Sequence, residues 1–243
     1  MRLLLSSDAL PDAPFEVLVA AARRRRLAGL ELTLDRGQGH GADASPCAAR
    51  VGDGTACFPD APADLAVAWL ALPAGAPLGL RTVWASAAGR LGAGVLLRRP
   101  APECPTALPT ALVHGTDPEA ARQSARWAAA HGAGTAWELR PSAFDADRWA
   151  AVLDATGPHL AHVRLLGAGP EAQSAAADGT GWLLGRLALR VYGGTVTLAP
   201  SSPGALPAWE RWLRRGRGWG CGTSAEKQAA QARAAAEPLS SHS

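Results

Sequence analysis

The stretch AHVRLLGAG, residues 161–169, has the pattern of a buried strand that carries two polar side chains on one face. Successive side chains of a strand point to opposite sides, so His162 and Arg164 face one way while Val163 and Leu165 face the other. Such a strand fits between a hydrophobic layer and an interior that holds charged groups.

Three other strand-like stretches share this alternation. Their polar faces carry Glu31, Thr33 and Asp35 (GLELTLD, residues 29–35), Glu138 and Arg140 (TAWELR, residues 135–140), and Thr195 and Thr197 (TVTLA, residues 195–199). If the leucine faces pack against helices, the polar faces point into one interior. Charges buried there have to be paired and hydrogen-bonded. We therefore expect Arg164 and Arg140 within ion-pair reach of Glu138 or Glu31, with His162 deeper on the same face.

Strands and helices alternate along most of the chain. The patterns predict strands at 2–6, 30–35, 66–72, 94–98, 110–114, 135–140, 161–166 and 195–199, and helices at 14–27, 78–91, from Pro118 onward after an Asp117 cap, 143–155, 179–192 and 205–215. A Gly-rich loop is expected at 36–60. Eight strands alternating with helices in one short domain favour an α/β fold of the (β/α)8 or TIM-barrel type. A doubly wound sheet would need a Gly-rich phosphate turn after the first strand, and SSDALPDAP, residues 6–14, contains none.

Two segments depart from the regular alternation. RPAPECPTALPT, residues 99–110, holds four prolines, so the fourth connection is expected to be shortened and to lack a full helix. Residues 223–243 are nearly devoid of large apolar side chains. We expect a barrel domain at 1–222 and a flexible, frayed or disordered C-terminal tail at 223–243.

The composition of the chain argues against nucleic acid and membrane as binding partners. A net charge of +3 over 243 residues gives no global field for nucleic acid, and no run of about 18 apolar residues predicts a membrane span. Four separated cysteines form no CxxC pair. We expect a cytoplasmic protein with reduced thiols that binds neither nucleic acid nor membrane; its oligomeric state is not indicated.

An ordered set of motifs resembles a known family. An ordered set is similar to motifs of the xylose isomerase-like barrels: His162-Val163-Arg164, Gly179-Thr180-Gly181 as the G-x-G before the seventh helix, Tyr192-Gly193-Gly194 and TVTLAP. These are sugar phosphate isomerases and epimerases, and the type-IV apurinic endonucleases belong with them. The resemblance implies a TIM barrel, a sugar phosphate substrate and proton transfer next to a carbonyl.

The resemblance also implies a divalent metal held at the strand ends, and here the sequence departs from the family. The family's ligands are a Glu ending the fifth strand, an acid and a His near the sixth, a His on the seventh and a Glu on the eighth. This chain has Val113 and His114, Arg164, and Ala199 and Pro200 at three of those places. Because an arginine offers no lone pair to a metal, we expect a degenerate metal site with no metal and no cofactor.

Seven residues are the candidate site. Arg140 and Arg164 would clamp a small anionic molecule such as a sugar phosphate, while Glu31, Glu138 and His162 would act as catalytic acids or bases. His40, in the loop DRGQGHG at 35–41, and His114, at the end of the fifth strand, are further ligand-binding candidates.

Several alternatives remain open. The same charges could form ion pairs that plug the barrel of a non-catalytic binding or scaffold protein. An endonuclease-like activity would need several His and carboxylate ligands and a basic DNA face. Ser6, Ser7 and Asp8 end the first strand, where turn chemistry is favoured over a place in the mouth.

Overall fold

The computed structural model describes residues 1–10, 13, 15–33, 50–52, 55–57, 64–72, 78–98, 107–167 and 173–199 of the chain. Several predictions lie outside these residues: His40 and most of its loop, the proline-rich stretch at 99–106, the helix at 205–215 and the tail at 223–243. The strand continuation over Leu34 and Asp35 lies outside them as well.

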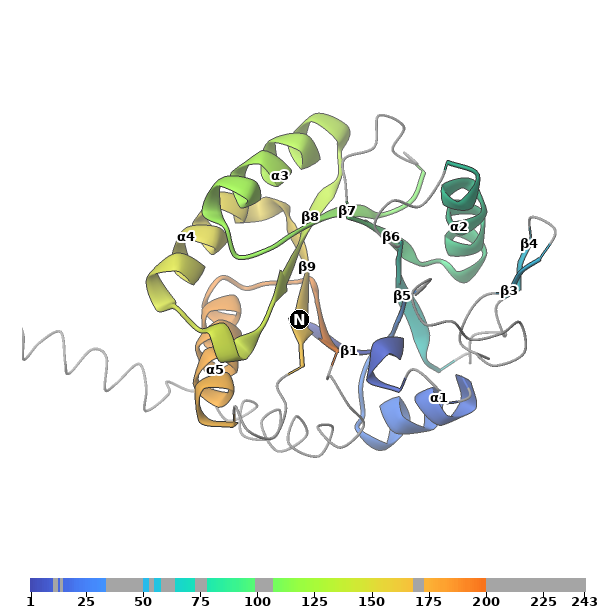
Figure 1. The fold of residues 1–243 in the computed structure, drawn as a ribbon, viewed down its shortest axis with the longest axis horizontal. Coiled ribbons are helices and arrows are strands. Elements are labelled where there is room, and N and C mark those ends of the chain that lie inside the picture. The colour runs from blue at the N-terminus through green and yellow to red at the C-terminus, as the bar shows by residue number, and fades with distance from the viewer. Residues whose placement is uncertain are drawn as a thin grey trace, which may run out of the picture.

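Eight parallel strands close into a barrel (Figure 1). The barrel strands are β1 (Arg2–Ser6), β2 (Gly29–Thr33), β5 (Ala66–Ala71), β6 (Gly94–Leu97), β7 (Thr110–His114), β8 (Gly134–Leu139), β9 (Leu160–Leu166) and β10 (Thr195–Ala199). Closure comes from β1, which pairs with both β2 and β10. The predicted α/β barrel is confirmed, and the predicted strands at 2–6, 110–114 and 195–199 match the observed bounds.

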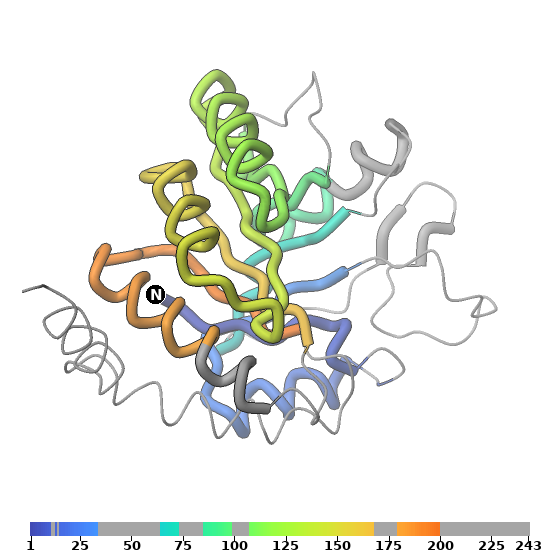
Figure 2. Tube along the Cα trace, turned by 60° about the vertical axis from the view of Figure 1, so that its left-hand side comes forward, coloured from blue at the N-terminus to red at the C-terminus, as the bar shows by residue number. Residues whose placement is uncertain are grey.

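Five α-helices are found in the described residues, and they lie outside the barrel wall (Figure 1). They are α1 (Phe15–Arg24), α2 (Leu78–Leu91), α3 (Pro118–His131), α4 (Ala146–Thr156) and α5 (Gln173–Leu189). Figure 2 shows α3 and α4 side by side on one flank. At the start of α3, the Asp117 carboxylate accepts a hydrogen bond from the Glu119 amide, as the predicted cap requires.

Two elements differ from the prediction. Helix α5 begins at Gln173 rather than at 179, so Gly179 and Gly181 lie well within the helix and not at its start. The predicted loop at 36–60 contains a small antiparallel hairpin of β3 (Arg50–Gly52) and β4 (Thr55–Cys57), which is separate from the barrel sheet.

The barrel wall separates two apolar regions, as the alternation predicts. On the outer side, strand residues such as Leu30, Val163 and Leu165 share one cluster with helix residues such as Leu18 and Trp149. The smaller interior cluster consists of Leu4, Trp69, Ala71, Leu96, Ala111 and Ala136. The rest of the described interior is polar, which is unusual because barrels are normally filled with branched apolar side chains.

Candidate functional site

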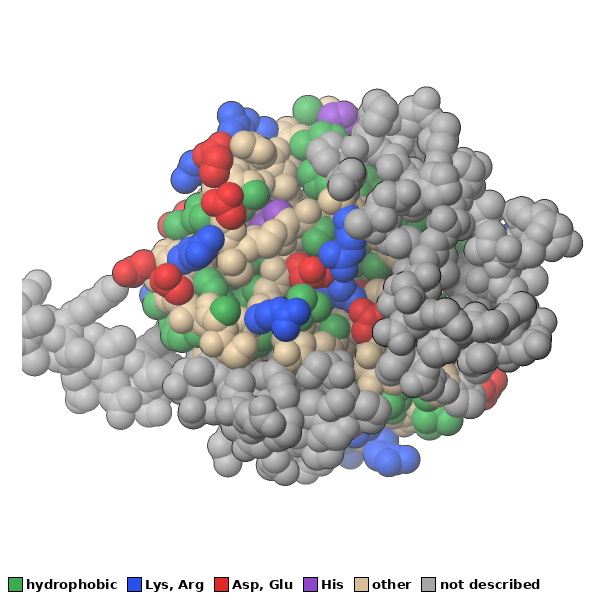
Figure 3. Space-filling view, viewed as in Figure 1, with side chains coloured by type: hydrophobic (Ala, Val, Ile, Leu, Met, Phe, Trp, Pro, Cys, Tyr) green, Lys and Arg blue, Asp and Glu red, His purple; other side chains and the backbone are tan. Residues whose placement is uncertain are grey.

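The polar side chains of β1, β2, β8 and β9 meet inside the barrel, toward the carboxyl ends of the strands. In Figure 3, acidic and basic side chains lie side by side over the middle of the barrel. Three short 3-10 turns border the strands: η1 (Ser7–Ala9), η2 (Pro141–Ala143) and η3 (Gly157–His159). Of these, η1 and η2 directly follow β1 and β8 and so lie at the carboxyl-terminal mouth.

The deepest part of the site is a hydrogen-bonded chain across the barrel. Trp69 Nε1 donates to Thr195 Oγ1 at 2.7 Å, and Thr195 Oγ1 lies 2.7 Å from His162 Nδ1. On the other side of the ring, His162 Nε2 lies 2.9 Å from Glu31 Oε2. Glu31 and His162 are both fully buried.

The bond to Glu31 indicates a proton on His162 Nε2. Burial alone would raise the pKa of Glu31, but the positive charge of Arg164 and the bond from His162 outweigh it and lower the pKa to about 2. An ionised carboxylate only accepts, so His162 Nε2 carries a proton and donates it. The Trp69 bond occupies a lone pair of Thr195, whose own proton can then point to Nδ1. The chain therefore joins Trp69, Thr195, His162 and Glu31 across the barrel.

Arg164 joins this chain to three carboxylates. Its Nε donates to Glu31 Oε1 at 2.6 Å, its Nη1 donates to Glu138 Oε2 at 2.8 Å, and its Nη2 donates to Asp8 Oδ2. Only 3% of Arg164 is exposed. Burial would lower its pKa, but the neighbouring carboxylates raise it above the usual value, so the guanidinium stays charged. The predicted contacts of Arg164 with Glu31 and Glu138 are therefore present.

Glu138 forms the outer layer of the site. Arg98, directly after β6, donates to both of its oxygens, from Nη1 at 3.1 Å and Nη2 at 2.9 Å. The side chains of Arg98 and Glu138 are 33% and 18% exposed. Partial burial raises the pKa of Glu138, but the bonds from Arg98 and Arg164 lower it overall. Sequence reasoning missed Arg98, although it ends the predicted strand 94–98 in phase with Leu96.

The turn after β1 belongs to the same site. Ser6 is the cap of η1, where its hydroxyl accepts from the Asp8 amide at 3.2 Å, and this is the predicted turn chemistry. The same hydroxyl lies 3.4 Å from Glu31 Oε1. Asp8 also bonds Thr33 and, as noted, Arg164. Ser6 and Asp8 therefore form the turn and also line the mouth, although the sequence suggested these roles as alternatives.

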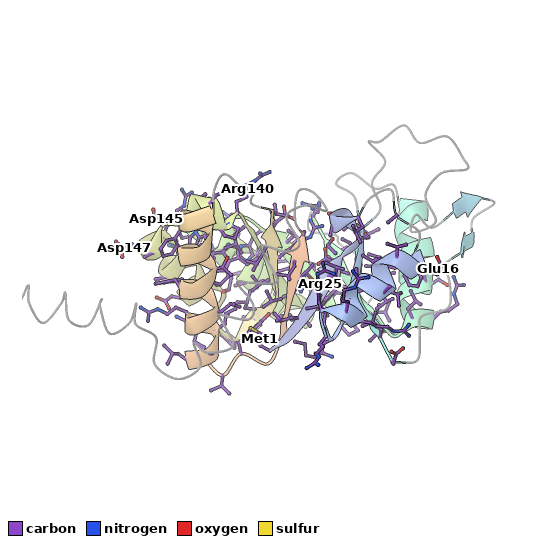
Figure 4. The ribbon with its side chains drawn as sticks, turned by 90° about the horizontal axis from the view of Figure 1, so that it is seen from below. Met1, Glu16, Arg25, Arg140, Asp145 and Asp147 are labelled. Carbon is purple, nitrogen blue, oxygen red and sulfur yellow. The ribbon has the colours of Figure 1, made fainter. Side chains whose placement is uncertain are left out.

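Two predicted ligand-binding residues lie apart from this cluster. Arg140 directly follows β8, is exposed and forms no ion pair with the described residues, so its predicted pairing with Glu138 or Glu31 is wrong. Figure 4 shows it at the opposite end of the barrel from Met1. His114 shares the outer face of β7 with Leu112, where burial lowers its pKa. Its Nδ1 bonds the Gly115 carbonyl at 2.9 Å, and Nε2 has no partner in the described part of the chain.

The residues at the mouth do not fit the divalent metal that the family resemblance implies. The guanidinium of Arg164 already occupies the carboxylates of Asp8, Glu31 and Glu138 as their cation. Val113 and Ala199 supply no ligand atoms in their side chains. Within the described ranges, no three His, Cys, Asp or Glu side chains are grouped to hold a metal.

A pocket of about 220 Å³ lies at the other end of the barrel. It is lined by residues from the end of α4, the start of β9 and the segment between α5 and β10, among them Leu153, Arg190 and Tyr192. None of the predicted site residues lines it. The phenol of Tyr192 donates to the Thr195 carbonyl at 3.1 Å, and burial raises its pKa.

No protein-family model matches the chain, and a search of curated proteins finds no significant match. No helix in the described residues is long and apolar enough to cross a membrane. The structure shows the closed eight-stranded parallel barrel of the TIM type.

Proposed function

We propose that this chain binds a small anionic molecule at the carboxyl-terminal mouth of the barrel, as a member of the xylose isomerase-like sugar phosphate isomerases and epimerases. The observation that carries the proposal is that two arginines with exposed surface follow strands at the mouth. Arg98 follows β6 and Arg140 follows β8, with β7 between the two strands. Both guanidiniums have solvent-facing surface, and a guanidinium binds phosphate or carboxylate with two parallel bonds.

Arg164 has a supporting role in this proposal. Its three carboxylate partners and its burial leave it unable to take an additional anion, so it anchors Glu138 from below. Glu31 and His162 are sealed in the same way. Of the three carboxylate and imidazole groups expected to be catalytic, Glu138 is the one that a bound molecule can touch.

The proposed reaction follows from the accessibility of Glu138. A sugar phosphate held by Arg98 and Arg140 would place its carbon skeleton over Glu138, which would move a proton next to the carbonyl. The reduced state expected of the four separated cysteines fits a cytoplasmic location for such a protein.

A second candidate is a barrel that binds the anion without chemistry. The burial of Glu31 and His162 favours it, because an isomerase or epimerase generally needs an acid and a base on the substrate, and of the three residues predicted to be catalytic only Glu138 is accessible.

Calorimetric titration tests the binding step. Aldose and ketose phosphates should bind, and the same sugars without phosphate should bind at least about tenfold more weakly. Arg140→Gln should weaken binding, while Arg126→Gln on the exposed face of α3 should not. Equal affinity for phosphorylated and neutral sugars would refute the proposal.

Deuterium exchange separates the two candidates. The ligands that bind are incubated with the protein in D₂O and followed by NMR. Incorporation of deuterium at the carbon next to the carbonyl, lost in Glu138→Gln, supports the isomerase. Tight binding without exchange supports the non-catalytic barrel.

A further inference from the structure

The ion pair of Arg98 and Glu138 differs from the other ion pairs of the cluster because its arginine is free to change its partner. The Arg98 side chain is one third exposed, and its bonds within the described residues go to Glu138. Arg164 is nearly sealed and shared among three carboxylates. Exposed ion pairs contribute little net free energy, whereas breaking a buried one is costly. Arg98 is therefore the guanidinium in this cluster that can exchange its partner.

The carboxylate of Glu138 imitates the anion that the proposed function requires. Arg98 holds it through two parallel hydrogen bonds, the geometry in which a guanidinium binds a phosphate or a carboxylate ligand. Glu138 does not depend on Arg98 for its position, because Arg164 Nη1 holds it at 2.8 Å. A ligand anion could take Arg98 while Glu138 stays in place.

From this geometry we infer that an anionic ligand displaces the Glu138 carboxylate from Arg98, so that binding at the mouth releases the acid that faces the ligand. The inference rests on the proposed function and adds that Glu138 is the residue whose bonding changes when the ligand binds. The ligand is an oxyanion with at least two adjacent oxygens, such as phosphate, sulfate or carboxylate. When no ligand is bound, the Glu138 carboxylate occupies the place of the ligand anion on Arg98.

The charge balance gives this exchange a direction. Asp8, Glu31 and Glu138 oppose Arg98 and Arg164, so the cluster carries one negative charge when His162 is neutral. These groups are the ones that face Glu138, directly or through Arg164. An arriving anion adds negative charge and removes a guanidinium from Glu138. Both effects favour the protonated acid, so ligand binding should raise the pKa of Glu138.

The test uses sulfate, which has no titrating proton near neutral pH, and the full-length protein. The Glu138 carboxyl signal is assigned in ¹³C NMR by its absence in Glu138→Gln, and it is titrated with and without saturating sulfate. We expect sulfate to raise the pKa of Glu138 by about one unit. Arg98→Gln should raise it by a similar amount without sulfate, after which sulfate should have no effect.

Three further variants make the result specific. Arg98→Lys keeps the charge without the two-bond geometry, and it replaces Arg98→Gln if that variant does not fold. Arg140→Gln should weaken sulfate binding and leave the pKa of ligand-free Glu138 unchanged. Arg126→Gln, in the exposed pair with Glu119 on α3, should change neither quantity.

The outcomes separate this inference from the function on which it rests. If sulfate and sugar phosphates bind and the pKa of Glu138 does not move, the exchange is wrong and the proposed function stands. If Arg98→Gln leaves the pKa of Glu138 unchanged, the exchange is also wrong. If no anion binds, the proposed function and the exchange both fall.

Discussion

The guanidinium of Arg164 connects side chains from two other strands and a turn, and it does so with almost no exposed surface. Truncating it leaves Glu31 buried without its main counter-charge. We expect Arg164→Ala to lower the free energy of unfolding by roughly 3 to 5 kcal/mol, as for a broken buried ion pair. Urea unfolding measures this. Arg126→Ala, which removes an exposed arginine on α3, should cost less than about 1 kcal/mol.

A small effect of Arg164→Ala would show that the cluster is hydrated and not sealed. In that case the variant should still fold and should lose anion binding, which would return Arg164 to the ligand-binding role expected from the sequence.

Glu31 makes a pH-dependent contribution to stability. Its pKa is lowered from the usual 4.5 to about 2 in the folded state, so its contribution is complete above pH 4.5 and is lost as the pH falls toward 2. The loss from this group is roughly 3 kcal/mol. Unfolding free energies measured at several pH values should show the fall, and Glu31→Gln should be less stable near neutral pH with a flatter profile across this range. An unchanged profile in the variant would assign the acid sensitivity to other carboxylates.

The positions of His114 and Arg140 could not be predicted from the sequence. His114 lies in TALVH, where both faces of the strand carry apolar side chains, so alternation alone could not tell the outer face from the inner one. Arg140 shares the phase of Glu138, but β8 ends at Leu139 because Pro141 begins the η2 turn. Arg98 takes the place on Glu138 that was expected for Arg140, through a pairing across strands that no local pattern contains.

At the scale of elements, helix α5 depends on a glycine at its contact with η2. A Cβ on Gly179 would lie 2.7 Å from the Pro141 carbonyl oxygen and 2.9 Å from the Phe144 Cβ. We expect Gly179→Ala to push the helix away and to cost roughly 1 to 3 kcal/mol in urea unfolding. Gly185, in the same helix, has open space around its Cβ position. Gly185→Ala should therefore be stabilising, by about 0.5 to 1 kcal/mol.

If both alanines stabilised the protein, the close packing of α5 on η2 would be wrong, because helix propensity alone would then explain both. The pair is a matched comparison, since residue type, helix and substitution are the same.

The elements could be predicted where local signals were strong. The Asp117 cap followed by Pro118 located α3, and leucines in alternation located β2 and β9. The start of α5 was missed because glycine is unfavourable inside a helix, and the contact of Gly179 with Pro141 and Phe144 is not visible in the local sequence. The β3–β4 hairpin was missed because three-residue strands give too short a pattern to detect.

At the scale of the whole molecule, the closed barrel could be predicted because eight strands alternated with helices in one short domain, and the polar strand faces then predicted a charged interior. The sequence could not show that the polar interior is layered, with Glu31 and His162 sealed below Arg164 and with Glu138 above it. That layering comes from the stagger of strands in a closed barrel and decides which acid a ligand can reach.

Closure also predicts how the molecule opens. Every barrel strand has two hydrogen-bonded neighbours, and β1 with β10 forms the seam between the two ends of the sheet. Without an edge strand there is no local route for fraying, so the amides of β1 and β10 should exchange with deuterium as slowly as those of β8 and β9. The β3–β4 hairpin serves as the control within the same chain, because an isolated two-stranded hairpin is marginally stable and should exchange at least about a hundredfold faster. Hydrogen exchange followed by mass spectrometry resolves these segments. Rapid exchange confined to β1 and β10 would mean that the seam opens independently. Thr195, which belongs to β10, would then separate from His162 and Trp69, and the hydrogen-bonded chain across the barrel would open with the seam.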